Sequence, residues 1–243
     1  LALEWKTEEE AHPLVQGDIP LVMENIFDLH IEEHDLTPQL MKRTLKSYIE
    51  QFDPTQSYLT KEEADYYYFP SATLIQNAVE GYYRNDYTIF TQLDELFYHA
   101  TERKQQIRKK VLANLPDFTV PSNIISIPDT FTSSEKELEE RTRKELENFI
   151  YIQNKLLPNT SEESYQKILR LYEKQMHDRE YLFLNETAYG EKQEAKEREH
   201  FQTLHILKAL SNSLDSHTAY FSPTEAYEMR LRLEKDFYGF GES

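Results

Sequence analysis

The clearest candidate for chemistry in this sequence is a pair of histidines with a glutamate beside the second. The run His30-Ile-Glu-Glu33-His34 matches H-x-x-E-H, the inverted zinc-peptidase signature. On a helix the two imidazoles would share one face and bind Zn²⁺, with Glu33 as general base. However, no third ligand stands out, and His34 falls where the helix should end before Pro38. Two polar histidines on a short amphipathic helix are the favoured alternative.

A second candidate is His217 beside Asp215, which together make half of a Ser-His-Asp triad. None of the glycines lies in a G-x-S-x-G turn, so a nucleophile of the hydrolase type lacks its usual position. A turn histidine bonded to backbone is therefore favoured. We expect no catalytic residue, no cofactor site and no metal beyond the weak zinc candidate.

Composition narrows the classes of partner. The chain carries 27 Lys and Arg against 44 Asp and Glu, for a net charge of -17, which is the wrong sign for binding a phosphate backbone. It has no cysteine, which excludes disulfides and thiolate chemistry. No run approaches the roughly 18 apolar residues of a membrane span, and the acidic opening after Leu1 lacks the pattern of a signal peptide. Nucleic acid and a membrane span are therefore not expected.

Helices must position these residues, since the chain has only 5 glycines in 243 residues and many good helix formers. Thr37-Pro38 indicates a helix start, and Thr60 with Glu63 forms a capping-box pattern. Apolar residues at helical spacing extend the prediction along the chain. We predict an all-α fold with helices over residues 19–29, 38–52, 61–69, 71–83, 89–111, 134–157, 161–185, 191–214 and 222–234.

One stretch, residues 114–133, breaks the helical pattern with prolines and the alternation Ile125-Ser-Ile127. It predicts an ordered crossover loop or a lone extended segment. We expect an N-terminal arm over residues 1–18, a helical domain over 19–235 with a sub-boundary at this loop, and a connecting segment over 236–243.

Two connections between helices have matching sequences. The run Asp53-Pro-Thr-Gln-Ser-Tyr58-Leu-Thr60-Lys-Glu-Glu63 aligns without gaps with Asp215-Ser-His-Thr-Ala-Tyr220-Phe-Ser222-Pro-Thr-Glu225. In each, the aspartate can accept from backbone amides in the turn, the tyrosine can fix the loop, and a hydroxyl residue caps the next helix. Whether the match is an ancestral repeat or ordinary turn chemistry stays open. Either way, we predict two rigid corners.

The second corner, with the helix before it and Phe237-Tyr-Gly239-Phe-Gly241 after it, resembles the D-P-H-T-x-Y-x-S-P … G-I-G junction of the C-terminal processing peptidases. These are the tail-specific proteases, with a Ser-Lys catalytic pair. The first corner resembles the helical N-terminal region of their longer, Prc-like branch. The sequence departs from the family pattern at Ser216, where proline is usual, and at Phe240, where isoleucine is usual.

The resemblance implies a non-catalytic helical regulatory or assembly domain of a serine endopeptidase that acts on proteins from their C-terminus. The PDZ domain and the Ser-Lys core would lie beyond these residues and would take the protein substrates. The resemblance also implies a periplasmic location and allows homodimer formation through the helical domain. The structural junction would be made by Asp53, Tyr58, Asp215, His217, Tyr220, Ser222, Gly239 and Gly241.

Two alternatives belong to other classes. A stand-alone α-helical protein-interaction module would use an exposed apolar patch, but no fixed repeat period supports it. A zinc peptidase would depend on His30, Glu33 and His34. The zinc peptidase requires bound metal. A reading frame that continues into a PDZ domain and a protease core would distinguish the tail-specific protease from the interaction module.

Overall fold

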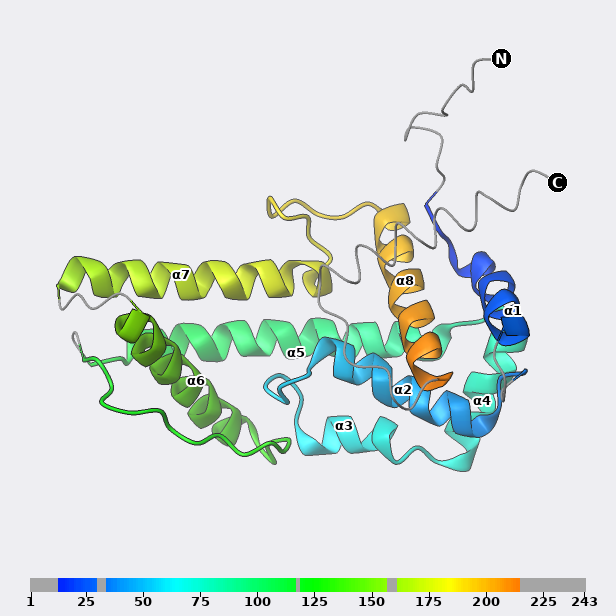
Figure 1. Cartoon of the computed structure of the whole chain (residues 1–243), viewed down its shortest axis with the longest axis horizontal. Coiled ribbons are helices and arrows are strands. Elements are labelled where there is room, and N and C mark those ends of the chain that lie inside the picture. Colours follow the sequence, from blue (N-terminus) through cyan, green and yellow to red (C-terminus); the bar gives the residue numbers. More distant parts are fainter. Residues whose placement is uncertain (1–12, 30–33, 117–118, 157–160, 215–243) are drawn as a thin grey trace, which may run out of the picture. The chain divides into compact units, whose positions relative to one another are not determined.

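The computed structural model describes residues 13–29, 34–116, 119–156 and 161–214, and these residues are mainly helical (Figure 1). Apart from two isolated bridges, Thr60–Thr132 and Glu186–Lys192, these residues form no β-structure. The all-α prediction is thus confirmed. The elements are η2 (Gln16–Asp18), α1 (Ile19–Leu29), α2 (Pro38–Phe52), α3 (Lys61–Tyr68), α4 (Ala72–Tyr83), α5 (Thr88–Ala113), α6 (Glu135–Leu156), α7 (Glu162–Glu180), η3 (Tyr181–Leu184) and α8 (Ala195–Leu214).

The predicted caps set the helix starts. The Thr37 hydroxyl accepts from the Leu40 amide at 3.2 Å, which satisfies one of the free donors at the start of α2. At α3 the Thr60 hydroxyl accepts from the Glu63 amide, and the Glu63 carboxylate accepts from the Thr60 amide at 2.8 Å. This reciprocal pair is the capping box that the sequence predicts.

Two helix limits differ from the prediction by more than two residues. The helix expected over 161–185 ends at Glu180 and continues as η3, which Asn185 closes in the left-handed conformation at φ 56. The helix expected over 191–214 begins only at Ala195, because residues before it turn through Gly190 at φ 79. The sequence also predicts that the charged run 191–199 is a solvated helix face. Instead, residues 191–194 of this run precede α8, and Gln193 among them is buried.

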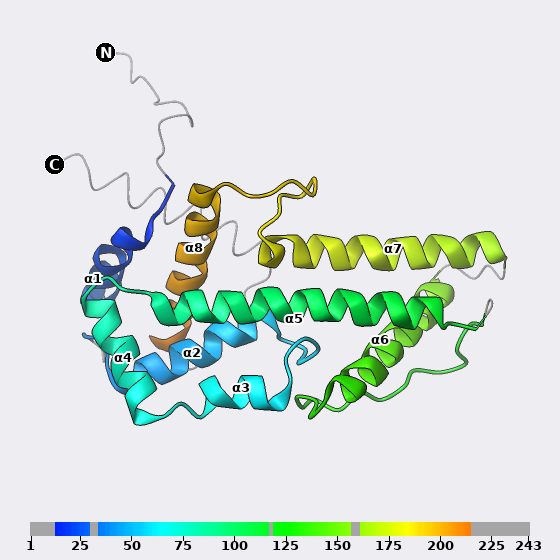
Figure 2. The same cartoon turned by 180° about the vertical axis from the view of Figure 1, so that it is seen from behind.

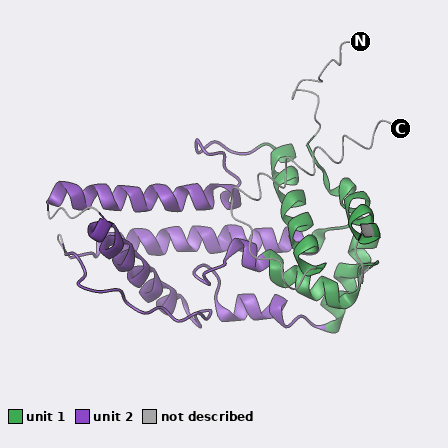
Figure 3. Cartoon of the chain, in the orientation of Figure 1, with its two compact units in different colours: residues 1–48, 72–88, 194–243 green, residues 49–71, 89–193 purple. Residues whose placement is uncertain are grey.

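The chain divides into two compact units, each built from segments far apart in sequence (Figure 3). Unit 1 comprises residues 1–48, 72–88 and 194–243, and unit 2 comprises residues 49–71 and 89–193. The division falls within α2 and near the start of α5.

Unit 1 packs α1 against α8 around an apolar interior. Ile19 and Met23 of α1 and Ile206 of α8 are fully buried. The rings of Tyr48 and His205 stack with their centroids 3.8 Å apart. Burial of this aliphatic and aromatic surface is the main stabilising contribution to such a core.

Unit 2 has an aromatic centre and an aliphatic end. Phe52 stacks on Phe97 at 4.2 Å between ring centroids and meets Phe183 edge-on at 4.7 Å. Further along α5, the buried aliphatic residues pack with α6 and α7 in one cluster. That cluster comprises Ile107, Val111, Leu138, Leu146, Ile150, Tyr165 and Tyr172.

The described part of the 114–133 loop is tied to neighbouring elements of unit 2. The Asn148 side chain of α6 accepts from the Ile125 amide at 2.7 Å and donates to the Ile125 carbonyl at 2.8 Å. The Lys61 amide at the start of α3 donates to the Thr132 carbonyl at 2.7 Å. These bonds give backbone groups of the loop their hydrogen-bond partners. Of the two predicted alternatives, an ordered crossover loop and a lone extended segment, the described residues form the ordered crossover loop.

Candidate functional site around the first corner

The corner between α2 and α3 is organised by the carboxylate of Asp53, which is 1% exposed. One oxygen accepts from the Ser57 amide at 2.6 Å, and the other accepts from the Tyr58 and Leu59 amides at 3.0 and 2.9 Å. Gln56 completes the turn in the left-handed conformation. Burial raises the pKa of Asp53, and the three amides oppose that shift. This carboxylate thus fixes the backbone of the whole corner.

A buried ion pair holds the side chain of Tyr58. Its hydroxyl donates to Glu180 of α7 at 2.9 Å, while Arg108 of α5 binds both oxygens of that carboxylate at 2.7 Å. Burial lowers the pKa of Arg108, but Glu180 outweighs it, so the net pKa lies above its ordinary value. α5 and α7 run side by side in both views (Figure 1 and Figure 2), and this pair joins them.

Arg103 of α5 connects the corner to α3. Its guanidinium donates to the Tyr58 carbonyl at 2.8 Å and to both oxygens of Glu63 at 2.7 and 2.9 Å. Although burial pushes the pKa of Glu63 upward, Arg103 and the Thr60 amide hold it below its ordinary value. The capping box of α3 and the corner are thus one hydrogen-bonded unit.

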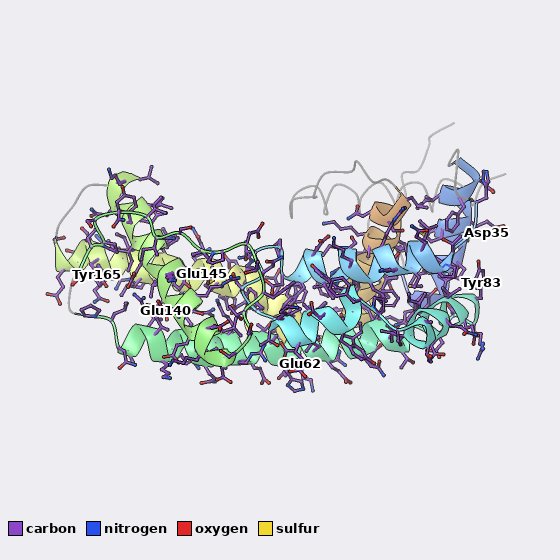
Figure 4. The ribbon with its side chains drawn as sticks, turned by 90° about the horizontal axis from the view of Figure 1, so that it is seen from below. Asp35, Glu62, Tyr83, Glu140, Glu145 and Tyr165 are labelled. Carbon is purple, nitrogen blue, oxygen red and sulfur yellow. The ribbon has the colours of Figure 1, made fainter. Side chains whose placement is uncertain are left out.

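Glu145 of α6, which Figure 4 labels, links the corner to α5. It accepts from the Lys104 ammonium at 2.7 Å and from the Ser57 hydroxyl. Burial lowers the pKa of Lys104, and Glu145 opposes the shift. Because both Ser57 and Lys104 donate to Glu145, the lysine acts here as an ion-pair partner and not as a base for the serine hydroxyl.

Arg141 of α6 ties the corner to the crossover loop. Its guanidinium donates to the carbonyls of Pro128 and Thr130 at 2.8 and 2.6 Å, and also to the Gln56 carbonyl. Arg141 is 5% exposed, so its charge is buried against backbone dipoles. Loop, corner and α6 are therefore fixed to one another within unit 2.

A pocket of 530 Å³ opens beside the corner. Corner and crossover residues form part of its wall, and α5, α6 and α7 supply the rest. Its size falls within the usual range for small-ligand sites.

The structure describes three of the predicted site residues. It places Asp53 and Tyr58 together in the first corner, and it leaves His34 exposed, with its Nδ1 3.3 Å from the Phe27 carbonyl. Outside the described residues lie the remaining zinc candidates and the remaining junction residues: His30, Glu33, Asp215, His217, Tyr220, Ser222, Gly239 and Gly241. Among the residues that are described, no cluster of three potential metal ligands occurs, and no helix has the length and apolar character of a membrane span.

Sequence reasoning missed the charged residues that hold the corner, above all Lys104, Arg108 and Glu180. A signal for two of them was present. Lys104 and Arg108 follow Ala100 at steps of four residues, so they lie on the apolar face of α5 that includes Ile107 and Val111. Charges on such a face are buried and need a partner.

Comparison with known proteins gives one family. The sequence model of the family described as the tail specific protease N-terminal domain matches residues 22–224, which is most of the chain. A search of curated proteins finds no match.

Proposed function

The chain belongs to the tail-specific protease N-terminal domain family, and on that premise we propose that it is the non-catalytic regulatory or assembly domain of a tail-specific serine endopeptidase. In this proposal the helices shape substrate access and set where a PDZ domain and a Ser-Lys core sit. Protein substrates reach the active site through those domains, and self-association uses the helical domain. A periplasmic location is part of the same proposal and comes from the family.

The observation that supports a positioning role is the first corner. Its charged groups are buried or half-buried and are paired with one another or with backbone groups, and α3, α5, α6 and α7 all contribute to holding it. A network whose charged groups are paired in this way favours one rigid arrangement. The sequence match between the two corners extends the role to Asp215, His217, Tyr220 and Ser222, with Gly239 and Gly241 in the connection that follows. The predicted arm at 1–18, domain at 19–235 and connection at 236–243 belong to this proposal.

The test is Asp53→Ala in the full-length protease. It removes the acceptor of three buried amides, and we expect a loss of about 2–4 kcal/mol of unfolding free energy. Below the unfolding transition, KM for an unfolded protein substrate should rise, while kcat for a short peptide changes little. Asp178→Ala on the surface of α7 is the matched control. It should leave the KM for the unfolded protein and the kcat for the short peptide unchanged.

Two outcomes would contradict the positioning role. One is a variant with unchanged stability and unchanged cleavage of both substrates. The other is a folded variant whose kcat falls equally on both substrates, since that result would place the corner in the chemical step.

A further inference from the structure

A short stretch of the crossover loop, residues 124–128, runs without helix, turn or bend along α6 (Figure 1 and Figure 2). We call it the edge segment. The Asn148 side chain of α6 bonds both the amide and the carbonyl of Ile125, and Arg141 of α6 donates to the Pro128 carbonyl at 2.8 Å. Helix α6 thus holds the edge segment at two points.

The backbone of the edge segment is open on the side away from α6. The two bonds to Asn148 require the amide and the carbonyl of Ile125 to point the same way, as they do in an extended chain. In such a chain the backbone groups of the next residue, Ser126, point the opposite way. The backbone groups of Ile124, Ser126 and Ile127 make no hydrogen bond to any residue that the structure describes, and Ser126 is exposed. Open groups of this kind can pair with another extended chain.

The 530 Å³ pocket adjoins this open backbone, because Ile127 and Pro128 line it. Phe149 of α6 and Met176 of α7 supply further apolar wall. A space of this size can take one aromatic or branched aliphatic side chain. Where a peptide is bound by strand addition, backbone hydrogen bonds give the affinity, and pockets of this kind receive alternate side chains. The edge segment and its pocket therefore have the two parts that strand addition needs.

Exposed apolar side chains extend the same surface. Ile124 in the edge segment is 56% exposed, and Ile152 and Leu156 of α6 are 43% and 67% exposed. Ile152 follows Asn148 by four residues, and Leu156 follows Ile152 by four, so they share the face of α6 that holds the edge segment. A chain paired with the edge segment would find further apolar contact on this face.

The charges at the pocket are balanced. Lys104 and Glu145 pair at 2.7 Å, and the exposed side chains of Arg179 and Asp129 have opposite signs. The net charge of -17 on the whole chain repels acidic segments. Pro128 has no amide to donate, so two copies of the edge segment would pair poorly with each other. These features favour an uncharged, apolar segment of another protein over an acidic peptide or a second copy.

We propose that the edge segment binds an extended, uncharged stretch of an unfolded protein by strand addition, with one apolar side chain of that stretch in the adjoining pocket. Because the hydrogen bonds are made by backbone groups, recognition depends little on the sequence of the stretch. The inference rests on the proposed function, since unfolded protein substrates are the source of such stretches. The two can fail separately, because peptide binding is measured on this chain alone and the positioning role is measured by cleavage in the full-length protease.

The test is fluorescence anisotropy of a labelled nonapeptide titrated with the 243-residue chain. The peptide has blocked ends and a central phenylalanine between alternating valines and threonines. Methylating the nitrogens of its five central amides removes the donors of both edges, and we expect binding to weaken at least about tenfold. Replacing the phenylalanine with alanine should also weaken binding about tenfold, since the aromatic ring then leaves the pocket empty.

Ser126→Pro removes the amide donor from the edge segment itself. Proline and the residue before it both suit an extended chain, so the melting temperature should stay unchanged, while binding of the nonapeptide weakens about three- to tenfold. Ser126→Ala keeps the amide and is the matched control, which should bind as the parent chain does.

Three results would overturn the proposal. They are no binding of the nonapeptide by the parent chain, equal binding of the methylated and unmethylated peptides, and full binding by the folded Ser126→Pro variant. A fourth result, in sedimentation experiments, is a dimer of the parent chain that Ser126→Pro converts to a monomer. That result would assign the edge segment to a second copy instead.

Discussion

The Tyr58 hydroxyl donates at 2.9 Å to a Glu180 carboxylate that Arg108 already binds through both oxygens. These residues come from the corner, α7 and α5, so a single buried carboxylate joins three separate segments of unit 2. Glu180 is 1% exposed. The Arg108–Glu180 ion pair serves mainly to fix one arrangement of these segments. A buried ion pair often contributes little net stability compared with apolar residues of similar size.

We predict that Glu180→Gln destabilises the domain by about 3–5 kcal/mol, because it leaves the buried Arg108 guanidinium without its counter-charge. Urea unfolding followed by circular dichroism measures the change. The double variant Arg108→Met/Glu180→Leu should regain much of the loss. Glu163→Gln, in an exposed pair with Lys167, should unfold at the same urea concentration as the parent chain. A Glu180→Gln variant as stable as the parent would show that the pair does not hold unit 2 together.

We predict an acid-sensitive contribution from His205 in unit 1. Burial and the nearby charge of Lys208 lower the pKa of His205 from 6.5 to about 3. In the unfolded chain the imidazole takes up a proton below pH 6.5, while in the folded chain it stays neutral down to about pH 3. Stability is therefore fully present above pH 6.5 and falls as the pH drops toward 3, by up to about 1.4 kcal/mol per pH unit.

The measurement is the free energy of unfolding between pH 7 and pH 4. His205→Phe keeps a ring on Tyr48 and should flatten the dependence on pH, while His99→Asn at an exposed site should not. An unchanged slope in His205→Phe would contradict the assignment.

We predict that Gly81→Ala destabilises unit 1 by about 1–3 kcal/mol, even though alanine is the better helix former. A Cβ at this position would lie 2.5 Å from the Asp86 carbonyl oxygen. The Asp86 amide also donates to the Gly81 carbonyl at 2.7 Å, so the turn cannot open without losing that bond. Thermal unfolding should show a lower midpoint for Gly81→Ala than for Gly17→Ala, whose Cβ would meet only the Asn85 side chain at 3.7 Å. Equal midpoints would refute the steric argument.

The sequence allowed prediction of the helices and of the local chemistry of the first corner, because both depend on residues close together in the chain. Thr60 and Glu63 are three residues apart, and the Asp53 carboxylate reaches amides within six residues. Apolar spacing located α5 and α7 in the same way.

The polar contacts between helices could not be predicted, because they join residues far apart in sequence. Tyr58 and Glu180 are separated by 122 residues, and Ser57 and Glu145 by 88. Glu180 ends a helix with charged neighbours on the preceding turn and looks like a surface residue from sequence alone. The order of the crossover loop likewise depends on Arg141 and Asn148, which no local pattern assigns to it.

The most direct test of a non-catalytic role is the cleavage of an unfolded protein with an apolar C-terminal tail. The 243-residue chain is compared with a version extended beyond Ser243 into PDZ and protease domains, each with and without a metal chelator. We predict no cleavage by the 243-residue chain and chelator-insensitive cleavage by the extended version. Chelator-sensitive cleavage by the 243-residue chain would contradict this account.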